Sequence, residues 1–532
     1  MMMDTPLNAW LLFDHSPNHA PDAQLVSRSP SGRVERRTYA EFGRRTQQLM
    51  HALDRLGLEK GDRVATLAWN SSNHLEAYFG VPCSERVLHT LNLRVSPEEL
   101  AYMLKDADDR AVLVDPDLLP LLEQALDHVT APSHLVVLGD HVPETRLAGV
   151  IAYEDLIADE PTHYPRREID ERQAMGLCYT SGTTGRPKGV VYTHRSTFLH
   201  ALAVTSHAGM SIGPGDATLP QVPMFHANAW GMPYAAAAVG AKQVFYAGAL
   251  DPSSFIDILR DERVTVTAGV PTVWLGIADE LGRRAETLPH LRHIVCGGAQ
   301  PPRSMIERYA AEFGIRIVQA WGMTETSPLS SMAWPQERMR DWSEEEVTAA
   351  ARTKAGLPLP GVEVTVRDES GGEVPADGSS MGDLFVRGPW VVDGYLHGQG
   401  VENFTEDGWF KTGDVAIRSP EGYFVIADRT KDLIKSGGEW ISSVDMEDRV
   451  MHMDSVLEAA VIAVPDPKWQ ERPLVCVVVK PGETLSADDV RAHLLAGGFA
   501  SWQLPDRIEV IEAVPRTAVG KYDKKALRQQ FG

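Results

Sequence analysis

A short glycine-rich segment, residues 179–190, carries the strongest chemical signal in the sequence. It reads YTSGTTGRPKGV and combines three glycines with four hydroxyl side chains and one lysine. Glycines let backbone N–H groups converge, and hydroxyl and ammonium groups donate hydrogen bonds, so the segment offers the donors that a polyphosphate requires. We therefore predict a phosphate-binding loop formed by Thr180, Ser181, Gly182, Thr183, Thr184, Gly185 and Lys188.

The spacing within this loop excludes the common NTPase loop. A Walker A loop needs Gly-Lys-Ser/Thr after a glycine and four further residues, and neither Gly182 nor Gly185 has Gly-Lys at that offset. Strand-like residues flank the loop, with LCY before it and VVY after it. A solvated Gly/Ser/Thr linker would leave those flanks unexplained, so a loop held between two strands is the preferred interpretation.

Six further segments contain residue types suited to nucleotide and acyl chemistry. They are PMFHANAW at 223–230, GGAQPP at 297–302, QAWGMTET at 319–326, GWFKTGD at 408–414, DRTKDLIKSGGEWIS at 428–442 and PRTAVGK at 515–521. Together with the phosphate loop, they resemble, in the same order, the motifs of the adenylate-forming enzymes, a family of acyl-CoA synthetases, luciferases and peptide-synthetase adenylation domains. The resemblance runs from about residue 30 to the C-terminus. FHANAW and LHTLNLR (88–94) look most like bacterial medium- and long-chain fatty-acyl-CoA synthetases.

The QAWGMTET segment suits a Mg-ATP site. Trp321 can stack on adenine, Thr324 can hydrogen-bond the α-phosphate, and Glu325 is a hard oxygen ligand for Mg²⁺, with Thr180 as its companion. The family usually has Tyr at the position of Trp321, so stacking is kept and a phenolic contact is lost. Outside this motif, Trp321 would be read as a core residue and Glu325 as a surface charge. The resemblance adds Gln319, Ala320 and Gly322 to the nucleotide site, and Gly298, Ala299 and Gln300 as a turn beneath adenine.

Other roles follow from the resemblance alone. Asp414 resembles the family's ribose-binding carboxylate, and Arg429 resembles its partner near the ribose and phosphate. His226 lies in the segment that the resemblance places beside the substrate carboxylate, and we interpret it as a positioning group. Trp230 resembles a residue that gates an acyl tunnel, with a packed core tryptophan as the alternative.

The C-terminal motifs suggest a site that is shared between two domains. Lys521 resembles the family's mobile lysine, which bridges the substrate carboxylate and the α-phosphate, although a C-terminal basic cluster is ordinarily a solvated helix face. The resemblance puts a hinge near Lys431. It also assigns a second working face of the small domain, toward the pantetheine arm of CoA, to Lys435, Gly437, Gly438 and Trp440.

The elements that must position these residues alternate between helix and strand. Helical periodicity over 42–56 and 98–105 is followed by strand-like runs at 63–67 and 111–115, which indicates an α/β fold. Residues 158–171 have little periodicity and predict a connection. Shorter β-like runs from Val362 predict a small β-rich subdomain. We expect a large N-terminal domain, residues 1–430, and a small mobile α+β domain, residues 431–532.

Composition limits the function classes further. The chain has 532 residues and a formal net charge of −22, from 51 Lys and Arg against 73 Asp and Glu. This charge repels phosphate backbones, so nucleic acid is not an expected partner. The most apolar internal stretch, residues 234–241, is too short to span a membrane, and no signal peptide is evident. Four cysteines without a CxxC pair favour a reducing cytoplasm. The family resemblance adds a possible homodimer, because related enzymes often form one.

The sequence thus predicts an AMP-forming acyl-CoA synthetase, which makes an acyl-adenylate from ATP and an acid and then transfers the acyl group to CoA. The resemblance favours a medium- or long-chain fatty acid, while short, aryl and thioether acids stay open. A stand-alone adenylating enzyme for a carrier protein and a luciferase-like oxidase are the enzymatic alternatives. A non-catalytic nucleotide-binding protein is disfavoured, because Thr180, Glu325, Asp414 and Lys521 are all present.

Overall fold

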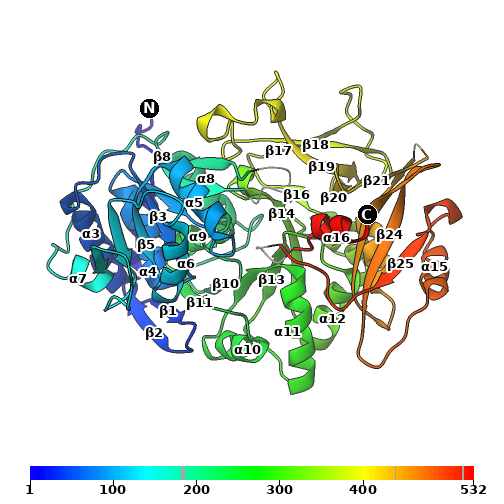
Figure 1. Ribbon diagram of the computed structural model, residues 1–532, viewed down its shortest axis with the longest axis horizontal. Helices are drawn as coiled ribbons and strands as arrows, with labels where there is room; N and C mark the ends of the chain where they lie inside the picture. Colours follow the sequence, from blue (N-terminus) through cyan, green and yellow to red (C-terminus); the bar gives the residue numbers. More distant parts are fainter. Residues whose placement is uncertain (181–185, 438, 518–520) are drawn as a thin grey trace.

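The computed structural model describes residues 1–180, 186–437, 439–517 and 521–532. Most of the chain forms one large unit that contains sheets of seven, nine and four strands, and the C-terminal residues build a five-stranded sheet at its side (Figure 1). The predicted α/β architecture with a smaller C-terminal α+β domain is therefore confirmed. Within the described residues, none of the helices combines the length and the apolar character that a membrane crossing needs.

The seven-stranded sheet holds the phosphate-loop segment. Its order is β7–β6–β5–β3–β4–β8–β9, parallel except for the final β8–β9 pair. The strands are β3 (Arg63–Leu67), β4 (Val87–Thr90), β5 (Asp109–Val114), β6 (His134–Val137), β7 (Val150–Ala152), β8 (Ala174–Tyr179) and β9 (Gly189–Thr193). Its connecting helices are α3 (Tyr39–Arg55), α4 (Ser72–Cys83), α5 (Pro97–Ala107), α6 (Leu119–Ala125) and α7 (Tyr153–Ile157).

Local sequence explains several boundaries in this part. Helix α3 begins at a capping box, in which the Thr38 side chain accepts a hydrogen bond from the Glu41 N–H and the Glu41 carboxylate accepts one from the Thr38 N–H. No helix or strand occurs between the end of α7 and the start of β8, as predicted for the connection at 158–171. Strands β8 and β9 pair antiparallel and flank the phosphate loop, as the LCY and VVY flanks predicted.

The nine-stranded sheet carries most of the remaining motifs. Its order is β16–β15–β14–β13–β12–β10–β11–β1–β2, with a parallel centre and antiparallel edges. The strands are β1 (Gln24–Arg28), β2 (Val34–Thr38), β10 (Ala217–Pro220), β11 (Lys242–Tyr246), β12 (Val266–Gly269), β13 (His293–Gly297), β14 (Arg316–Gly322), β15 (Leu329–Met332) and β16 (Leu357–Pro358). The helices include α8 (His194–Thr205), α9 (Met232–Val239), α10 (Pro252–Asp261), α11 (Pro271–Arg284) and α12 (Arg303–Phe313).

The predicted β-rich subdomain is a four-stranded antiparallel sheet. It consists of β17 (Glu363–Arg367), β18 (Met381–Arg387), β19 (Phe410–Arg418) and β20 (Phe424–Arg429), paired in chain order. This sheet lies at the top of Figure 1, above the ends of β14 and β16.

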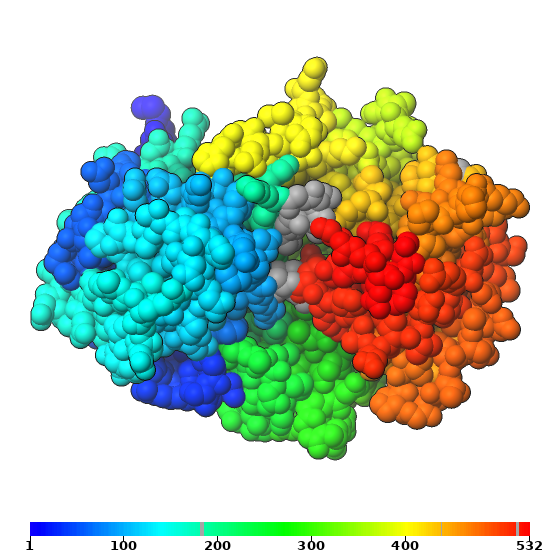
Figure 2. Space-filling view, viewed as in Figure 1, coloured from blue at the N-terminus to red at the C-terminus, as the bar shows by residue number. Residues whose placement is uncertain are grey.

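The C-terminal part has its own sheet and hydrophobic core. It contains β21 (Ile434–Ser436), β22 (Glu439–Ile441), β23 (Val456–Asp466), β24 (Gln470–Val479), β25 (Arg507–Val510), α14 (Ser443–Met451), α15 (Ala487–Ala496) and α16 (Lys524–Phe531). Lys524 anchors α16, because its Nζ lies 2.7 Å from Oε1 of the buried Glu447 on α14. In the surface view, the red C-terminal residues face the junction of the cyan, green and yellow parts (Figure 2).

This topology brings the motifs to one edge of each parallel sheet. The segments at 223–230, 298–302 and 321–326 follow or end the strands β10, β13 and β14, and the phosphate loop follows β8. The carboxyl ends of parallel strands are where open α/β sheets bind ligands, because the connecting loops diverge there and leave a crevice. The site should therefore lie where these ends meet the four-stranded sheet and the C-terminal domain.

Candidate active site

The base of the phosphate loop is closed by two backbone-linked residues. The N–H of Thr180 donates to the carbonyl of Lys188 over 2.9 Å, and the N–H of Lys188 donates to Oγ1 of Thr180 over 3.2 Å. The ammonium group of Lys188 lies 3.5 Å from Glu402. These contacts fix both ends of the loop at the edge of the seven-stranded sheet. Ser181, Gly182, Thr183, Thr184 and Gly185, which were also predicted here, lie outside the described residues.

Three predicted nucleotide residues form a connected group. Asp414 is 2% exposed on β19, and its Oδ1 lies 2.8 Å from Nε of Arg429, its partner in the β19–β20 register. Its other oxygen accepts a hydrogen bond from Nε1 of Trp321 over 3.0 Å. Trp321 also packs edge-on against Phe424. Asp414 is thus held on both oxygens, and Trp321 is fixed by its indole N–H, so its ring is rigidly oriented.

Glu325 is a buried carboxylate, 7% exposed, in a short helical turn after β14. Its Oε1 accepts a hydrogen bond from the hydroxyl of Tyr395 over 2.7 Å. Burial raises the pKa of Glu325, while the Tyr395 bond and the Arg429 charge oppose that rise. The neighbouring Thr324 is buried as well, and its carbonyl accepts a hydrogen bond from Tyr192 over 2.8 Å.

Lys521 reaches this group from the C-terminal domain. A Cβ on Gly298 would lie 3.2 Å from Cε of Lys521, so a side chain there would crowd the aliphatic part of the lysine. Gly298 also has a positive φ, which favours glycine. Burial and the Arg429 charge lower the pKa of Lys521 to about 8, with Asp414 and Glu325 acting in the opposite direction. The predicted mobile lysine therefore lies among the nucleotide residues of the large domain.

His226 lies within electrostatic range of Lys521 and immediately precedes an unusual backbone turn. Burial, followed by the charges of Lys521 and Arg94, lowers the pKa of His226 to about 3, so the imidazole is neutral. The next residues, from Ala227 through Gly231, all have positive φ, which non-glycine residues rarely adopt. This left-handed turn carries Trp230, whose ring edge lies against Gly297 at the end of β13. The turn thereby fixes the Trp230 ring against the end of β13, a few residues after His226.

The predicted second working face is separate from this cluster. Nζ of Lys435 lies 5.0 Å from the ring centre of Trp440, which is 39% exposed, and the N–H of Gly437 donates to the carbonyl of Trp469 over 2.8 Å. These contacts belong to the small domain. Lys431 is exposed between β20 and β21, and Gly438 lies outside the described residues.

The remaining predicted residues lie along the same strand ends. Gln319 is buried on β14, and its Oε1 has no hydrogen-bond partner among the described residues. Ala320 and Gly322 line the same strand, while Ala299 and Gln300 follow Gly298. Their assignment to the nucleotide site stays a prediction.

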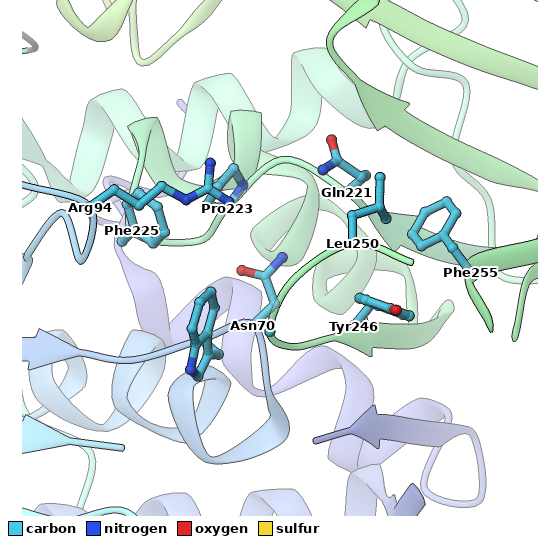
Figure 3. A pocket seen from close by; sticks show the side chains of 10 residues that line it. Asn70, Arg94, Gln221, Pro223, Phe225, Tyr246, Leu250 and Phe255 are labelled. Atoms are coloured by element: carbon cyan, nitrogen blue, oxygen red, sulfur yellow. The ribbon is translucent and has the colours of Figure 1, made fainter. Parts of the chain in front are cut away.

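Sequence reasoning missed three residues of the site: Tyr395, Tyr192 and Arg94. Each lies far along the chain from the group that it contacts, so no local spacing indicated it. Arg94 does fall in the LHTLNLR segment, but only the structure brings it near His226. Its side chain runs past Phe225 toward a small cavity lined by polar and aromatic residues (Figure 3).

Taken together, the cluster has two buried carboxylates, two cations and a neutral imidazole, which suits binding and charge stabilisation better than covalent catalysis. Among the residues with a described placement, no group of three or more His, Cys, Asp or Glu side chains could hold a metal ion. A bound cation would therefore need oxygen atoms from a ligand in addition to Glu325.

Comparison with known proteins agrees with this site. The family model described as AMP-binding enzyme matches residues 13–396, and the one described as AMP-binding enzyme C-terminal domain matches residues 445–521. A long-chain-fatty-acid–CoA ligase of Thermus thermophilus is 47% identical, covering 100% of this chain and 96% of the relative. A 3-methylmercaptopropionyl-CoA ligase of Ruegeria pomeroyi is 42% identical, covering 100% and 98%.

A solved structure shares the fold over nearly the whole chain. ATP-bound MatB from Rhodopseudomonas palustris superposes with a TM-score of 0.83 at 26% identity, covering 98% of this chain and 99% of that one. The fold, the order of the motifs and both family models lead to the same conclusion. The chain belongs to the AMP-binding enzyme family, as its resemblance to the adenylate-forming enzymes predicted.

Proposed function

We infer that this chain is an AMP-forming carboxylate–CoA ligase, and we propose a medium- or long-chain fatty acid as its substrate. The class is supported by relatives that are named as acid–CoA ligases and align over the whole chain. The fatty acid is supported by the 47% identical long-chain ligase and by a medium-chain-fatty-acid–CoA ligase at 39% identity. A thioether acid is the second candidate, because the 42% identical relative carries a methylmercaptopropionyl name.

One observation carries the proposal: Lys521 of the small domain lies against Gly298, within electrostatic range of Arg429, Asp414 and Glu325 of the large domain. An ammonium group there can contact both a carboxylate and an α-phosphate. Attack of one anion on another requires such a cation, since the two reactants repel each other until the bond forms.

The residues present fit a bound Mg²⁺. One carboxylate oxygen of Glu325 accepts a hydrogen bond from Tyr395, and Thr180 supplies a hydroxyl at the phosphate loop. Mg²⁺ in nucleotide sites is commonly bound by one or two carboxylates together with substrate phosphates, so it does not require a cluster of three protein ligands, and the described residues contain none. When bound, the metal would neutralise phosphate charge and favour departure of pyrophosphate.

In the proposed first half-reaction, an oxygen of the substrate carboxylate attacks the α-phosphorus of ATP, and the bond to the β-phosphate oxygen breaks. Trp321 stacks on adenine, and Asp414 accepts hydrogen bonds from the ribose hydroxyls while Arg429 holds it in place. His226 stays neutral and donates one hydrogen bond, from its ring N–H, to the carboxylate. Lys521 bridges the two reacting groups, so the acceleration comes from positioning and charge stabilisation.

In the proposed second half-reaction, the CoA thiolate attacks the acyl carbonyl carbon and AMP leaves. We propose that residues 431–532 rotate about a hinge near Lys431, withdraw Lys521, and present Lys435, Gly437, Gly438 and Trp440 to the pantetheine arm. The exposed, self-contained contacts of Lys435 and Gly437 support this, because they can move as a unit with the small domain. Such domain steps often limit turnover.

The thiols support a reducing compartment, so we propose that the enzyme acts in the cytoplasm. Cys83, Cys178, Cys296 and Cys476 are all buried and unpaired. Free buried thiols are ordinary in reducing compartments, where disulfides rarely persist. A homodimer is proposed from the family resemblance alone.

The first prediction tests the reaction class. Purified protein given ATP, Mg²⁺, CoA and a panel of carboxylic acids should release AMP and pyrophosphate, with the highest kcat/KM for medium- or long-chain fatty acids. AMP and ADP are separated by ion-exchange chromatography. ADP as the main product would contradict the class, and a preference for the thioether acid would replace the proposed substrate but keep the class.

A second prediction concerns Lys521. Lys521→Ala should slow acyl-adenylate formation by about a hundredfold or more, because a main contact to the developing charge is lost. Thioester formation from supplied acyl-adenylate should stay within about threefold of wild type, since that step is assigned to the other face of the small domain. Single-turnover assays of each half-reaction measure both. Equal loss in both half-reactions would show that Lys521 is not specific to adenylation.

The pH dependence of adenylation gives a third prediction. Because the ammonium form of Lys521 is required and its pKa is lowered to about 8, kcat/KM for ATP should be flat below pH 8 and fall above it, by about tenfold per pH unit. Acid-dependent pyrophosphate release without CoA isolates this step from thiol titration. Lys521→Arg should be slower but should lose this alkaline fall, since a guanidinium stays charged. An identical fall in Lys521→Arg would assign the titration to another group.

The fourth prediction tests the gate. If the Trp230 ring closes an acyl tunnel behind His226, Trp230→Ala should change the chain-length profile, with the relative kcat/KM for longer acids changing by about tenfold. The control is Trp342→Ala, which removes an exposed tryptophan outside the site. Trp274→Ala is not suitable, because Trp274 is fully buried in another core. An unchanged profile in Trp230→Ala would make Trp230 a packing residue only.

A further inference from the structure

We propose that Tyr395 is a positioning residue that couples the phosphate loop to the Glu325 carboxylate, so that the metal-bound form of ATP is recognised at one geometry. The inference rests on the proposed function and deepens it by adding a residue that no sequence motif indicated. Tyr395 lies between β18 and β19, far along the chain from both groups that it touches.

The first contact is with the carboxylate. The Tyr395 hydroxyl donates to Oε1 of Glu325 over 2.7 Å, and both side chains are buried. The backbone supports the same alignment, because the Val392 N–H donates to the Glu325 carbonyl over 2.9 Å. A hydrogen bond to one oxygen of a carboxylate fixes its rotation, which determines where its second oxygen points.

The second contact is with the phosphate loop. Nζ of Lys188 lies 5.1 Å from the centre of the Tyr395 ring, a distance at which a cation is attracted to an aromatic face. The ring is kept in this place by Gly400, where a Cβ would lie 2.7 Å from Cδ2 of Tyr395 and 3.1 Å from Nζ of Lys188. A side chain at position 400 would therefore collide with the Tyr395 ring, so the glycine permits this close packing.

Neighbouring residues tie the same segment to the base of the loop. Leu396 packs against Gly189, the first residue of β9, and Nε2 of His397 lies 3.0 Å from the carbonyl of Asp106. Asp106 in turn accepts a hydrogen bond from Tyr179, the last residue of β8, over 2.6 Å. The segment therefore contacts β9 directly and is linked to β8 through Asp106 of α5, and Tyr395 is its contact with the carboxylate.

These contacts separate two functions within one side chain. The hydroxyl is the part of the side chain that contacts Glu325, and the ring is the part that contacts Lys188, in addition to its packing against Phe404 and Phe410. Removal of the hydroxyl should therefore weaken binding of Mg-ATP and leave metal-free ATP unaffected. Removal of the ring as well should weaken both forms of ATP.

The test measures binding rather than turnover. Isothermal titration gives Kd for ATP in excess EDTA and for ATP in excess Mg²⁺, and their ratio reports how much the metal strengthens binding. In Tyr395→Phe, we expect this ratio to fall by about tenfold, because Glu325, the proposed metal ligand, loses the hydrogen bond that orients its carboxylate. Kd for metal-free ATP should stay within about twofold of wild type, because the ring over Lys188 is kept.

Two further variants make the result specific. Tyr395→Leu should weaken metal-free ATP by about threefold in addition, because it removes the ring beneath Lys188. Tyr309→Phe is the matched control: Tyr309 is also fully buried, its hydroxyl donates to the Trp274 carbonyl over 2.7 Å, and it belongs to a separate core. It should lower the melting temperature comparably and leave the Mg²⁺ ratio unchanged.

The outcomes distinguish this inference from the proposed function. A Tyr395→Phe ratio equal to that of wild type would overturn the positioning role, whatever the variant's activity. An equal fall in Tyr309→Phe would show a general effect of stability and would overturn it too. Wild-type protein that binds ATP equally with and without Mg²⁺ would instead contradict the magnesium proposal itself.

Discussion

Two buried carboxylates, Glu325 and Asp414, set the constraint on which the rest of the site depends. An ionised carboxylate without partners is costly in a protein interior, so each must be compensated. Asp414 has Arg429 and Trp321 on its two oxygens, and Glu325 has Tyr395. These partners come from β14, β20 and the segment after β18, which explains why the four-stranded sheet must pack on the end of the nine-stranded one. Burial raises the pKa of Glu325 and these partners oppose the rise, and an added cation would favour the ionised form further.

The left-handed turn after His226 is a second costly feature at the same place. Four consecutive non-glycine residues, from Ala227 to Trp230, have positive φ, and each costs on the order of 1 kcal/mol. The surroundings compensate in part, because Tyr78 donates hydrogen bonds to the Met224 carbonyl and to Oδ1 of Asn228. Strain of this kind persists where the surrounding structure fixes it, and it is commonly found at functional sites. Here it fixes the backbone that carries Trp230 against the end of β13.

Sequence alone predicted the local features well and the distant contacts poorly. The flanks of the phosphate loop, the helix at 42–56 and the β-rich texture after Val362 are set by short-range periodicity, and the structure confirms them. The motif residues Trp321, Glu325, Asp414, Arg429 and Lys521 were identified by resemblance, and their roles remain proposals although the structure gathers them. Tyr395 and Arg94 were missed because their partners are remote along the chain. The backbone strain at 227–231 had no signal either, since the letters ANAW allow ordinary helix as readily.

The electrostatics of Lys521 explain why, under the proposed mechanism, this cation should be carried by a domain that moves. Burial and Arg429 make the ammonium form unfavourable in the site without substrate, which lowers its pKa to about 8. A triphosphate and a substrate carboxylate would reverse this, because anions favour the charged form. Once pyrophosphate has left, much of that favourable charge is gone, and the ammonium group gains by returning to water. By linkage, the ligand that raises the pKa of Lys521 also stabilises the closed arrangement, and loss of that ligand favours opening. Under the proposed mechanism, the same charge that assists adenylation would thus favour release of the small domain before the thioester step.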